Sequence, residues 1–201
     1  MRPPVDYRIG CIVLAAGHSR RFGADKRQAR LPGGRTLLDH TLSSIPSSFL
    51  DRILVLHPGD EALAQDYSEH WQIVIADKAE LGMGHSLAAT IALASDWDGA
   101  VIALADMPWI SPGTYLMVKE TVRPENLVLP YFGEQRGNPV GIGRNFFPIL
   151  ANLEGDRGAR GLFQRHPESV VRLMLGDAGI VKDIDTPDAL AKDIAPEQPD
   201  A

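Results

Sequence analysis

Residues 9–26 read IGCIVLAAGHSRRFGADK, an apolar run that stops at a glycine and leads into a turn rich in cations. The run Ile9–Ala15 does not alternate between polar and apolar residues, which is typical of a strand buried on both faces of a mainly parallel sheet. Ligands of such sheets bind beyond the carboxyl ends of the strands. The segment therefore predicts an α/β fold with a binding loop directly after its first strand.

The loop that follows has the composition of an anion site. Gly17 and Gly23 permit positive φ angles and let a ligand approach the backbone, whose consecutive N–H groups can surround an anion. The loop also carries three cations, Arg20, Arg21 and Lys26. Two common phosphate loops do not fit: a Walker A loop needs Lys-Ser/Thr after its last glycine, and a dinucleotide fingerprint needs G-x-G-x-x-G.

The rest of the chain alternates between predicted strands and helices. Short apolar runs predict strands at Ile53–Leu56, Ile73–Ile75, Val101–Ala105, Leu127–Leu129 and Val170–Leu175. Apolar residues at helical spacing predict helices at Thr36–Ile45, Asp60–His70, His85–Ala94 and Pro112–Val122. This order predicts a three-layer α/β/α fold with a mostly parallel, doubly wound sheet. Residues 1–201 show no linker or repeat, so we expect one domain with flexible ends at 1–7 and 196–201.

Charge and cysteine content restrict the partners and the location. The net charge is −6, with 44% hydrophobic and 23% charged residues, so we expect neither nucleic acid nor an anionic membrane as a partner. The single cysteine, Cys11, lies in the first apolar run, which predicts a buried thiol. The sequence has no apolar stretch of roughly 18 residues, the length of a membrane span, and its first residues lack a signal peptide's apolar core. We therefore expect a cytoplasmic protein.

Two aspartates, Asp106 and Asp185, lie at the ends of two further predicted strands. Asp106 ends the strand of VIALADMPWI, residues 101–110, so it reaches the same sheet edge as the glycine loop. Carboxylate oxygens are ligands that Mg²⁺ prefers. VKDIDTPDAL, residues 181–190, predicts a short strand that leads through Asp185 into a helix capped by Thr186. Asp106 is therefore a candidate metal ligand, although it also fits a turn or a helix cap, whereas the Thr186 cap by itself accounts for the motif around Asp185.

A second glycine-rich loop precedes a predicted helix. LGMGHSLAATIA, residues 81–92, places Gly82 and Gly84 before amphipathic residues. A helix N-terminus offers free N–H groups and a partial positive charge to an anion. Ser86 in this stretch is equally a plain N-cap candidate.

The run L-A-A-G-x-S-x-R-F-G-x-x-K, residues 14–26, resembles the signature of nucleotidyltransferases that move an NMP group from an NTP. It is closest to the molybdenum-cofactor cytidylyltransferases and guanylyltransferases. D-M-P at 106–108, GNPVGIG at 137–143, GDRGAR at 155–160 and D-I-D-T-P at 183–187 extend the resemblance over residues 9–191. One departure is RQARLPGG after Lys26, which is more polar than the pattern and leaves the contacts of that segment open.

The resemblance implies roles for individual residues. The catalytic residues would be Arg21, Lys26 and Asp106. The nucleotide contacts would be Leu14, Ala15, Ala16, Gly17, Gly23, Lys26, Gly82, Gly84 and Ser86. The acceptor contacts would be Asn138, Pro139, Arg157 and Arg160, although the two arginines also fit a solvated helix face. Mg²⁺ would be held by Asp106 and Asp185.

One residue bears on the choice of nucleotide. The guanylyl-transferring relatives read L-A-G-G where this chain has Ala16 before Gly17, and the added methyl leaves less room near the base. CTP is therefore favoured over GTP. The resemblance then implies CMP transfer from CTP to molybdopterin or molybdenum cofactor, with release of pyrophosphate and with a molybdoenzyme or its chaperone as a further partner.

Other functions fit parts of the same pattern. Guanylyl transfer to molybdenum cofactor and transfer to a sugar or alcohol phosphate use the same first loop. A non-catalytic nucleotide- or cofactor-binding module would keep that loop but would need neither Asp106 nor Asp185. A nicotinamide-dependent oxidoreductase is disfavoured by the missing G-x-G-x-x-G.

Overall fold

Eight strands and seven α-helices lie within residues 6–17, 22–153 and 159–194, the part of the chain that this computed structural model describes. The strands are β1 (Ile9–Leu14), β2 (Arg52–Leu56), β3 (Gln72–Ile75), β4 (Gly99–Leu104), β5 (Leu127–Phe132), β6 (Gln135–Arg136), β7 (Val140–Gly143) and β8 (Val170–Met174). The α-helices are α1 (Leu37–Ser43), α2 (Glu61–Tyr67), α3 (Met83–Ile91), α4 (Pro112–Thr121), α5 (Phe147–Leu150), α6 (Arg160–Arg165) and α7 (Pro187–Ile194). Short 3₁₀ helices are η1 (Lys26–Gln28), η2 (Ala79–Leu81), η3 (Ala92–Ala94), η4 (Arg144–Phe146), η5 (Pro167–Ser169) and η6 (Ala178–Val181).

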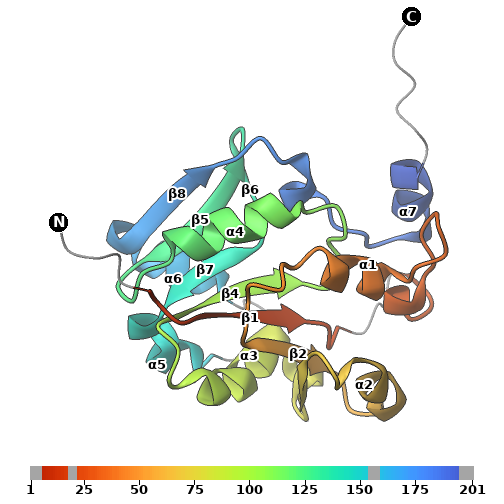
Figure 1. Cartoon of the computed structure of the whole chain (residues 1–201), viewed down its shortest axis with the longest axis horizontal. Coiled ribbons are helices and arrows are strands. Elements are labelled where there is room, and N and C mark those ends of the chain that lie inside the picture. The colour runs from red at the N-terminus through yellow and green to blue at the C-terminus, as the bar shows by residue number, and fades with distance from the viewer. Residues whose placement is uncertain (1–5, 18–21, 154–158, 195–201) are drawn as a thin grey trace, which may run out of the picture.

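The strands form one sheet with a parallel centre (Figure 1). The order is β3-β2-β1-β4-β7-β5-β6, and β8 pairs with β5. β1 is parallel to β2 and β4, β2 is parallel to β3, and β8 is parallel to β5, whereas β6 and β7 run antiparallel to their neighbours. The predicted α/β fold with a mostly parallel sheet is thus confirmed.

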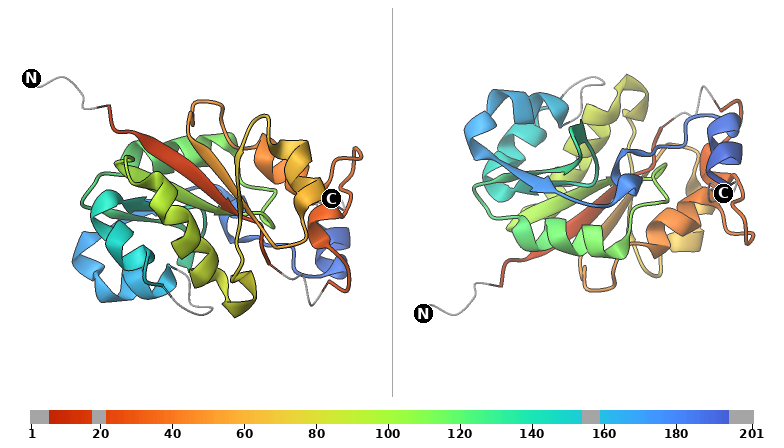
Figure 2. Two further views of the ribbon diagram at one scale, coloured as in Figure 1. Left: turned by 90° about the horizontal axis from the view of Figure 1, so that it is seen from below. Right: turned by 90° about the horizontal axis from the view of Figure 1, so that it is seen from above.

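Helices cover both faces of the sheet (Figure 2), and β1 shows why. Cys11 and Val13 pack into the layer that holds α1, α2 and α4, while Ile12 and Leu14 pack into the layer that holds α3, α5 and α6. Cys11, Ile12 and Val13 are 0% exposed, as the unbroken apolar run predicts for a strand covered on both sides. The 0% exposure of Cys11 confirms the predicted buried thiol, and this burial raises the pKa of the thiol.

The predicted bounds of the parallel strands agree closely with the structure, whereas those of the strands in the antiparallel part of the sheet agree less well. β6 was not predicted, because two exposed polar residues carry no apolar pattern. β5 continues to Phe132, three residues past its apolar run, because Tyr131 and Phe132 pair with β6. The expected flexible ends fall mainly on residues 1–5 and 196–201, which lie outside the described residues.

Two local predictions are wrong. The strand expected from residue 181 does not form: η6 ends at Val181, and the Ile184 amide then donates to the carbonyl of Asp106, which lies beyond Leu104, the last residue of β4. Ser86 is not an N-cap, because α3 already begins at Met83 after Gly82. Gly82 has a φ of 115°, a conformation that glycine adopts readily, and this sharp turn starts the helix early.

None of the described helices is both long and apolar enough to cross a membrane.

Candidate functional site

A pocket of about 480 Å³ opens beyond the carboxyl ends of β1 and β4, where the sequence predicts the site. Its wall comes from the end of β1, from η1, from the starts of α1 and α3, from η2, from the end of β4 and from the segment before α7. The lining residues are Leu14, Ala15, Ala16, Gly17, Lys26, Arg27, Leu37, Ala79, Glu80, Gly82, Met83, Ser86, Leu104, Ala105, Asp106 and Asp185. Segments more than 150 residues apart in the chain therefore meet at one sheet edge.

The end of β1 forms an apolar wall with an open glycine. Ala15 and Ala16 are 3% and 6% exposed, and the Ala15 amide donates to the Val55 carbonyl of β2 at 2.9 Å. A Cβ placed on Gly17 would meet nothing within 4 Å among the described residues. Gly17 thus leaves space on the pocket side of the chain, where a ligand can approach the backbone.

The opposite wall is the beginning of α3. Gly82 and Met83 stand at its first turn, and Ser86, only 4% exposed, lies one turn further along the same wall. The first N–H groups of a helix have no partner within the helix, so this end of α3 presents donors and a partial positive charge to the pocket.

Three carboxylates converge at the edge of the pocket. Asp106, Asp183 and Asp185 each offer an oxygen within 4.8 Å of the others. The Lys26 ammonium lies on two of them, donating to Asp106 Oδ2 at 2.7 Å and to Asp185 Oδ1 at 2.9 Å. Burial works against the charge of Lys26, but the pairing with Asp106 and Asp185 outweighs it, so the pKa of Lys26 is raised. The cluster joins two elements that the sequence separates by 159 positions.

One oxygen of this cluster has no hydrogen bond within the described part of the chain. Asp106 Oδ1 is buried, and none of the described residues donates to it. A buried carboxylate oxygen without a donor is costly, so such an atom calls for a bound partner.

Hydrogen bonds fix the backbone that carries Asp106. The buried Thr41 hydroxyl of α1 donates to the Ala105 carbonyl at 3.0 Å, and the Ile184 amide donates to the Asp106 carbonyl at 2.9 Å. Ile184 is 0% exposed and packs with Leu31 and Leu37. Burying Ile184 on one side of the extended chain turns the side chains of its two acidic neighbours to the other side.

Asp177 secures the start of the segment that carries the second and third carboxylates. It accepts from the Thr114 hydroxyl at 2.6 Å and from the amides of Ser111 and Gly179 at 2.9 Å each. Burial would raise the pKa of Asp177, but these hydrogen bonds hold it below its usual value. The side chain thereby ties the N-terminus of α4 to η6.

We expect Asp177→Asn to lower the free energy of unfolding by about 1 kcal/mol near neutral pH, after allowance for partial exposure. Because the folded pKa is lower than the unfolded value of about 3.9, the stabilisation exists above that value and disappears as pH falls through the folded pKa. Urea unfolding of both proteins across the acidic range measures the gap. Asp188→Asn, at an exposed position of α7, serves as the control. A gap that stays constant through the acidic range would contradict this role.

The structure brings together most of the predicted site residues. Those that line the pocket are Leu14, Ala15, Ala16, Gly17, Lys26, Gly82, Ser86, Asp106 and Asp185. Predicted residues within the described ranges that do not line it are Gly23, Gly84, Asn138, Pro139 and Arg160. Arg160 is exposed at the start of α6, and the Asn138 amide donates to the Ile180 carbonyl at 2.9 Å. Arg21 and Arg157 lie outside the described residues.

Sequence reasoning missed Asp183 and Arg27. A signal for Asp183 existed, because acidic residues on both sides of an apolar one share a face of an extended chain. Arg27 gave no such signal, since a charged residue in a polar stretch does not predict burial, yet it is 8% exposed and lines the pocket.

The chain is similar in sequence to a known protein family and to individual known proteins. Residues 11–170 match the family model described as the MobA-like NTP transferase domain. The chain is 32% identical over 200 residues to the purine catabolism protein PucB of Bacillus subtilis, covering 94% of this chain and 95% of that one. It is 26% identical over 185 residues to the nicotine blue oxidoreductase of Paenarthrobacter nicotinovorans, covering 87% and 91%.

A solved structure has the same fold. Rv0371c of Mycobacterium tuberculosis superimposes with a TM-score of 0.79 at 26% identity, covering 92% of this chain and 97% of that one. A second structure of Rv0371c, with a TM-score of 0.76, 24% identity and coverages of 94% and 99%, is a complex with manganese.

Proposed function

Since the chain belongs to the family of MobA-like NTP transferase domains, we propose that it transfers CMP from CTP to molybdopterin or molybdenum cofactor and releases pyrophosphate. The observation that carries this proposal is the meeting of the first loop with the acidic cluster in one pocket. Lys26 at the end of that loop lies on Asp106 and Asp185. A pocket that bound a nucleotide without a metal would keep the first loop but would have no need of the converging carboxylates.

The acidic cluster fits a divalent cation. Its three carboxylates offer hard oxygen ligands within 4.8 Å of one another, and Asp106 Oδ1 lacks a donor among the described residues. Asp106, Asp183 and Asp185 would hold Mg²⁺, which when bound supplies neutralising charge to phosphate oxygens. The manganese complex of Rv0371c supports a divalent ion in this fold.

The residues of the pocket would act by positioning and by charge. In the proposed reaction a terminal phosphate oxygen of the acceptor attacks the α-phosphorus of CTP, and the bond to the β-phosphate breaks. The backbone at Gly17 and the N-terminus of α3 would bind the phosphates, since Gly17, Gly82 and Met83 line the pocket and backbone amides at such positions bind anions. Lys26 would stabilise the negative charge that grows on pyrophosphate. No protein nucleophile is needed for a direct displacement at phosphorus.

Ala16 supports the choice of CTP. It is 6% exposed and lines the pocket, so its methyl group takes up space at the wall where the resemblance puts the nucleotide. We expect the protein to use CTP in preference to GTP. Ala16→Gly should relax the ratio of kcat/KM values by about tenfold, because one methyl group is typically worth 10-fold or more in discrimination. The measurement is pyrophosphate release with Mg²⁺, molybdopterin and each of the four NTPs.

The matched control is Ala105→Gly, which removes another methyl group from the pocket wall at the end of β4. It should leave the CTP-to-GTP ratio unchanged even where both rates fall. Preferred use of GTP by the unaltered protein would contradict cytidylyl transfer and favour the guanylyl alternative. Release of pyrophosphate only with a sugar or alcohol phosphate would contradict the acceptor.

A further inference from the structure

Arg27 stands where the sequence departs from the resembling pattern, and the fold buries it. Its side chain is 10% exposed, and the carboxylates of Asp25 and Asp60 beside it are 39% and 14% exposed. A buried guanidinium is costly unless its charge and its N–H groups are matched. The way its donors are matched therefore indicates what the residue does.

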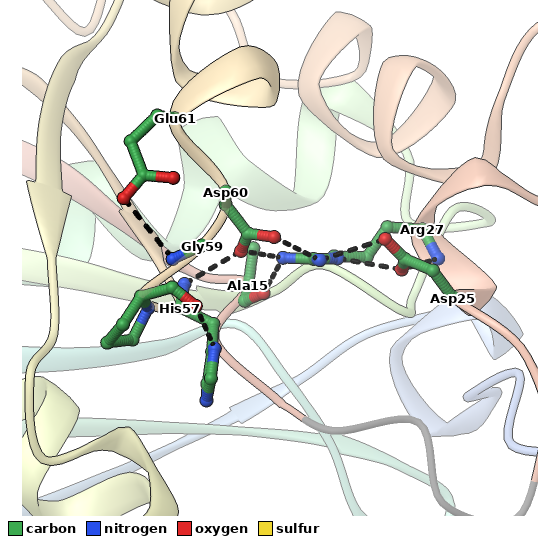
Figure 3. A network of polar contacts seen from close by, with 8 residues as sticks. Ala15, Asp25, Arg27, His57, Gly59, Asp60 and Glu61 are labelled. Atoms are coloured by element: carbon green, nitrogen blue, oxygen red, sulfur yellow. Dashed lines mark hydrogen bonds and ion pairs between the residues drawn. The ribbon is translucent and has the colours of Figure 1, made fainter.

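All five N–H donors of the Arg27 guanidinium have protein acceptors (Figure 3). Nε donates to Asp25 Oδ1 at 2.8 Å, and Nη2 donates to Asp25 Oδ2 and Asp60 Oδ1 at 2.8 Å each. Nη1 donates to the Ala15 carbonyl at 2.9 Å and to Asp60 Oδ2 at 2.5 Å. Although Arg27 lines the pocket, this arrangement leaves it no N–H for a phosphate. Its role is to hold protein rather than ligand.

The three acceptors belong to three separate segments of the chain, of which Ala15 lines the pocket. Ala15 follows β1, Asp25 caps the start of η1, and Asp60 lies in the loop between β2 and α2. Asp60 occupies the N-cap position of α2 but makes no capping bond there; its carboxylate instead accepts from Arg27 and from the His57 amide at 2.8 Å. Burial would raise the pKa of Asp60, but these bonds hold it below its usual value. The Asp60 carboxylate thus binds Arg27 instead of capping its own helix.

The neighbour of Arg27 is Lys26, the cation on the acidic cluster. Both belong to η1, and side chains of successive residues in a 3₁₀ helix leave it about 120° apart. Arg27 is directed at Asp60, and Lys26 at Asp106 and Asp185. We propose that Arg27 is a positioning residue: by fixing η1 to β1 and to the loop before α2, it aims Lys26 at the acidic cluster. The inference rests on the proposed function only for its kinetic test.

The first test is Mn²⁺ binding to the nucleotide-free protein, followed by electron paramagnetic resonance. Lys26→Met should tighten binding, because the ammonium no longer competes for the carboxylates. Arg27→Lys should tighten it in the same direction, because a lysine cannot match five acceptors and Lys26 is then held less firmly. The double variant should bind no more tightly than Lys26→Met alone, since Arg27 acts through Lys26. Independent, multiplying effects would overturn the proposal.

The second test is kinetic. Arg27→Lys should lower kcat for pyrophosphate release by about 10- to 100-fold, the typical effect of a misplaced group, with a smaller change in KM for CTP. Combined with Lys26→Ala, it should lower kcat no further than Lys26→Ala alone. If Arg27 had only a structural role, Arg27→Lys would lower kcat by the same factor in the unaltered protein and in Lys26→Ala. Its effects on kcat and on KM for CTP would then be similar in size.

Arg8→Lys is the matched control. Arg8 precedes the other end of β1 and makes a similar fork, with Nε and Nη2 on Asp51 at 2.8 and 2.7 Å and Nη1 on Asp96. It should leave Mn²⁺ binding and kcat near those of the unaltered protein. Asp60→Asn, which removes one anchor and keeps Arg27, should reproduce the Arg27→Lys effects and replaces that variant if circular dichroism shows it unfolded. If no nucleotide releases pyrophosphate, the proposed function fails, and the Mn²⁺ measurements alone decide the role of Arg27.

Discussion

Asp106→Asn should lower kcat for nucleotidyl transfer by about 10²- to 10³-fold. A bound metal ion that neutralises phosphate charge stabilises the transition state by several kcal/mol, and each 1.4 kcal/mol corresponds to about tenfold in rate. Asparagine keeps the shape of the side chain but removes the charge that pairs with Lys26 at 2.7 Å. If the remaining amide oxygen keeps the contact with Lys26, the NH2 group takes the place of the buried Oδ1, which has no donor among the described residues, and an NH2 group is not a metal ligand. The same variant should weaken Mn²⁺ binding to the free protein.

The fold should survive this change. Asp106 stands beside two other carboxylates, so the loss of one negative charge relieves repulsion while it weakens one ion pair. Thermal unfolding is therefore expected to stay close to that of the unaltered protein. Asp66→Asn, at an exposed position of α2, is the control for the loss of a surface carboxylate. Turnover near the normal rate in Asp106→Asn would rule out the metal role.

Lys26→Met should separate turnover from metal binding. The ammonium makes two charge-assisted hydrogen bonds, at 2.7 and 2.9 Å, to carboxylates that the proposal gives to the metal. Such a bond is typically worth about 1.5–3 kcal/mol, which corresponds to about 10- to 150-fold. We expect kcat to fall by an amount in this range and KM for CTP to rise less, because charge develops on pyrophosphate as the bond breaks. Mn²⁺ binding without nucleotide should tighten instead.

Lys182→Met is the control for the general effect of charge. Lys182 is exposed, directly precedes Asp183 and does not line the pocket. The substitution therefore removes the same charge near the same cluster without altering the pocket. Its Mn²⁺ affinity and its kcat should change little. Unchanged kinetics in Lys26→Met would mean that the ammonium serves only to balance the carboxylates.

The sequence predicted what depends on local pattern. Unbroken apolar runs identified β1 and β4, and parallel strands necessarily end at the same edge, so the meeting of Gly17 with Asp106 was predictable. The approach of Asp185 to Asp106 was an expectation from resemblance. It depends on the burial of Ile184 with Leu31 and Leu37, a long-range contact that no local pattern records.

What could not be predicted depends on partners distant in the chain. Arg27 reads as a surface cation until Asp60 is brought beside it, and only the pairing of β1 with β2 does so. The strand predicted from residue 181 failed for a related reason: Ile184 lies beside Asp106, beyond the end of β4 at Leu104. The interpretation of Ser86 as an N-cap failed because the N-cap of α3 is Gly82, whose positive φ starts the helix four residues earlier.

The proposed function is the transfer of a nucleotidyl group from an NTP to molybdopterin in this pocket. It is tested most directly by incubating the protein with Mg²⁺, molybdopterin and CTP labelled either at the α- or at the γ-phosphate. We expect the α-label to appear in a cytosine dinucleotide of molybdopterin and the γ-label in pyrophosphate, in equal amounts and only when the acceptor is present. Label that stays in CTP under these conditions, and likewise in ATP, GTP and UTP, would contradict it.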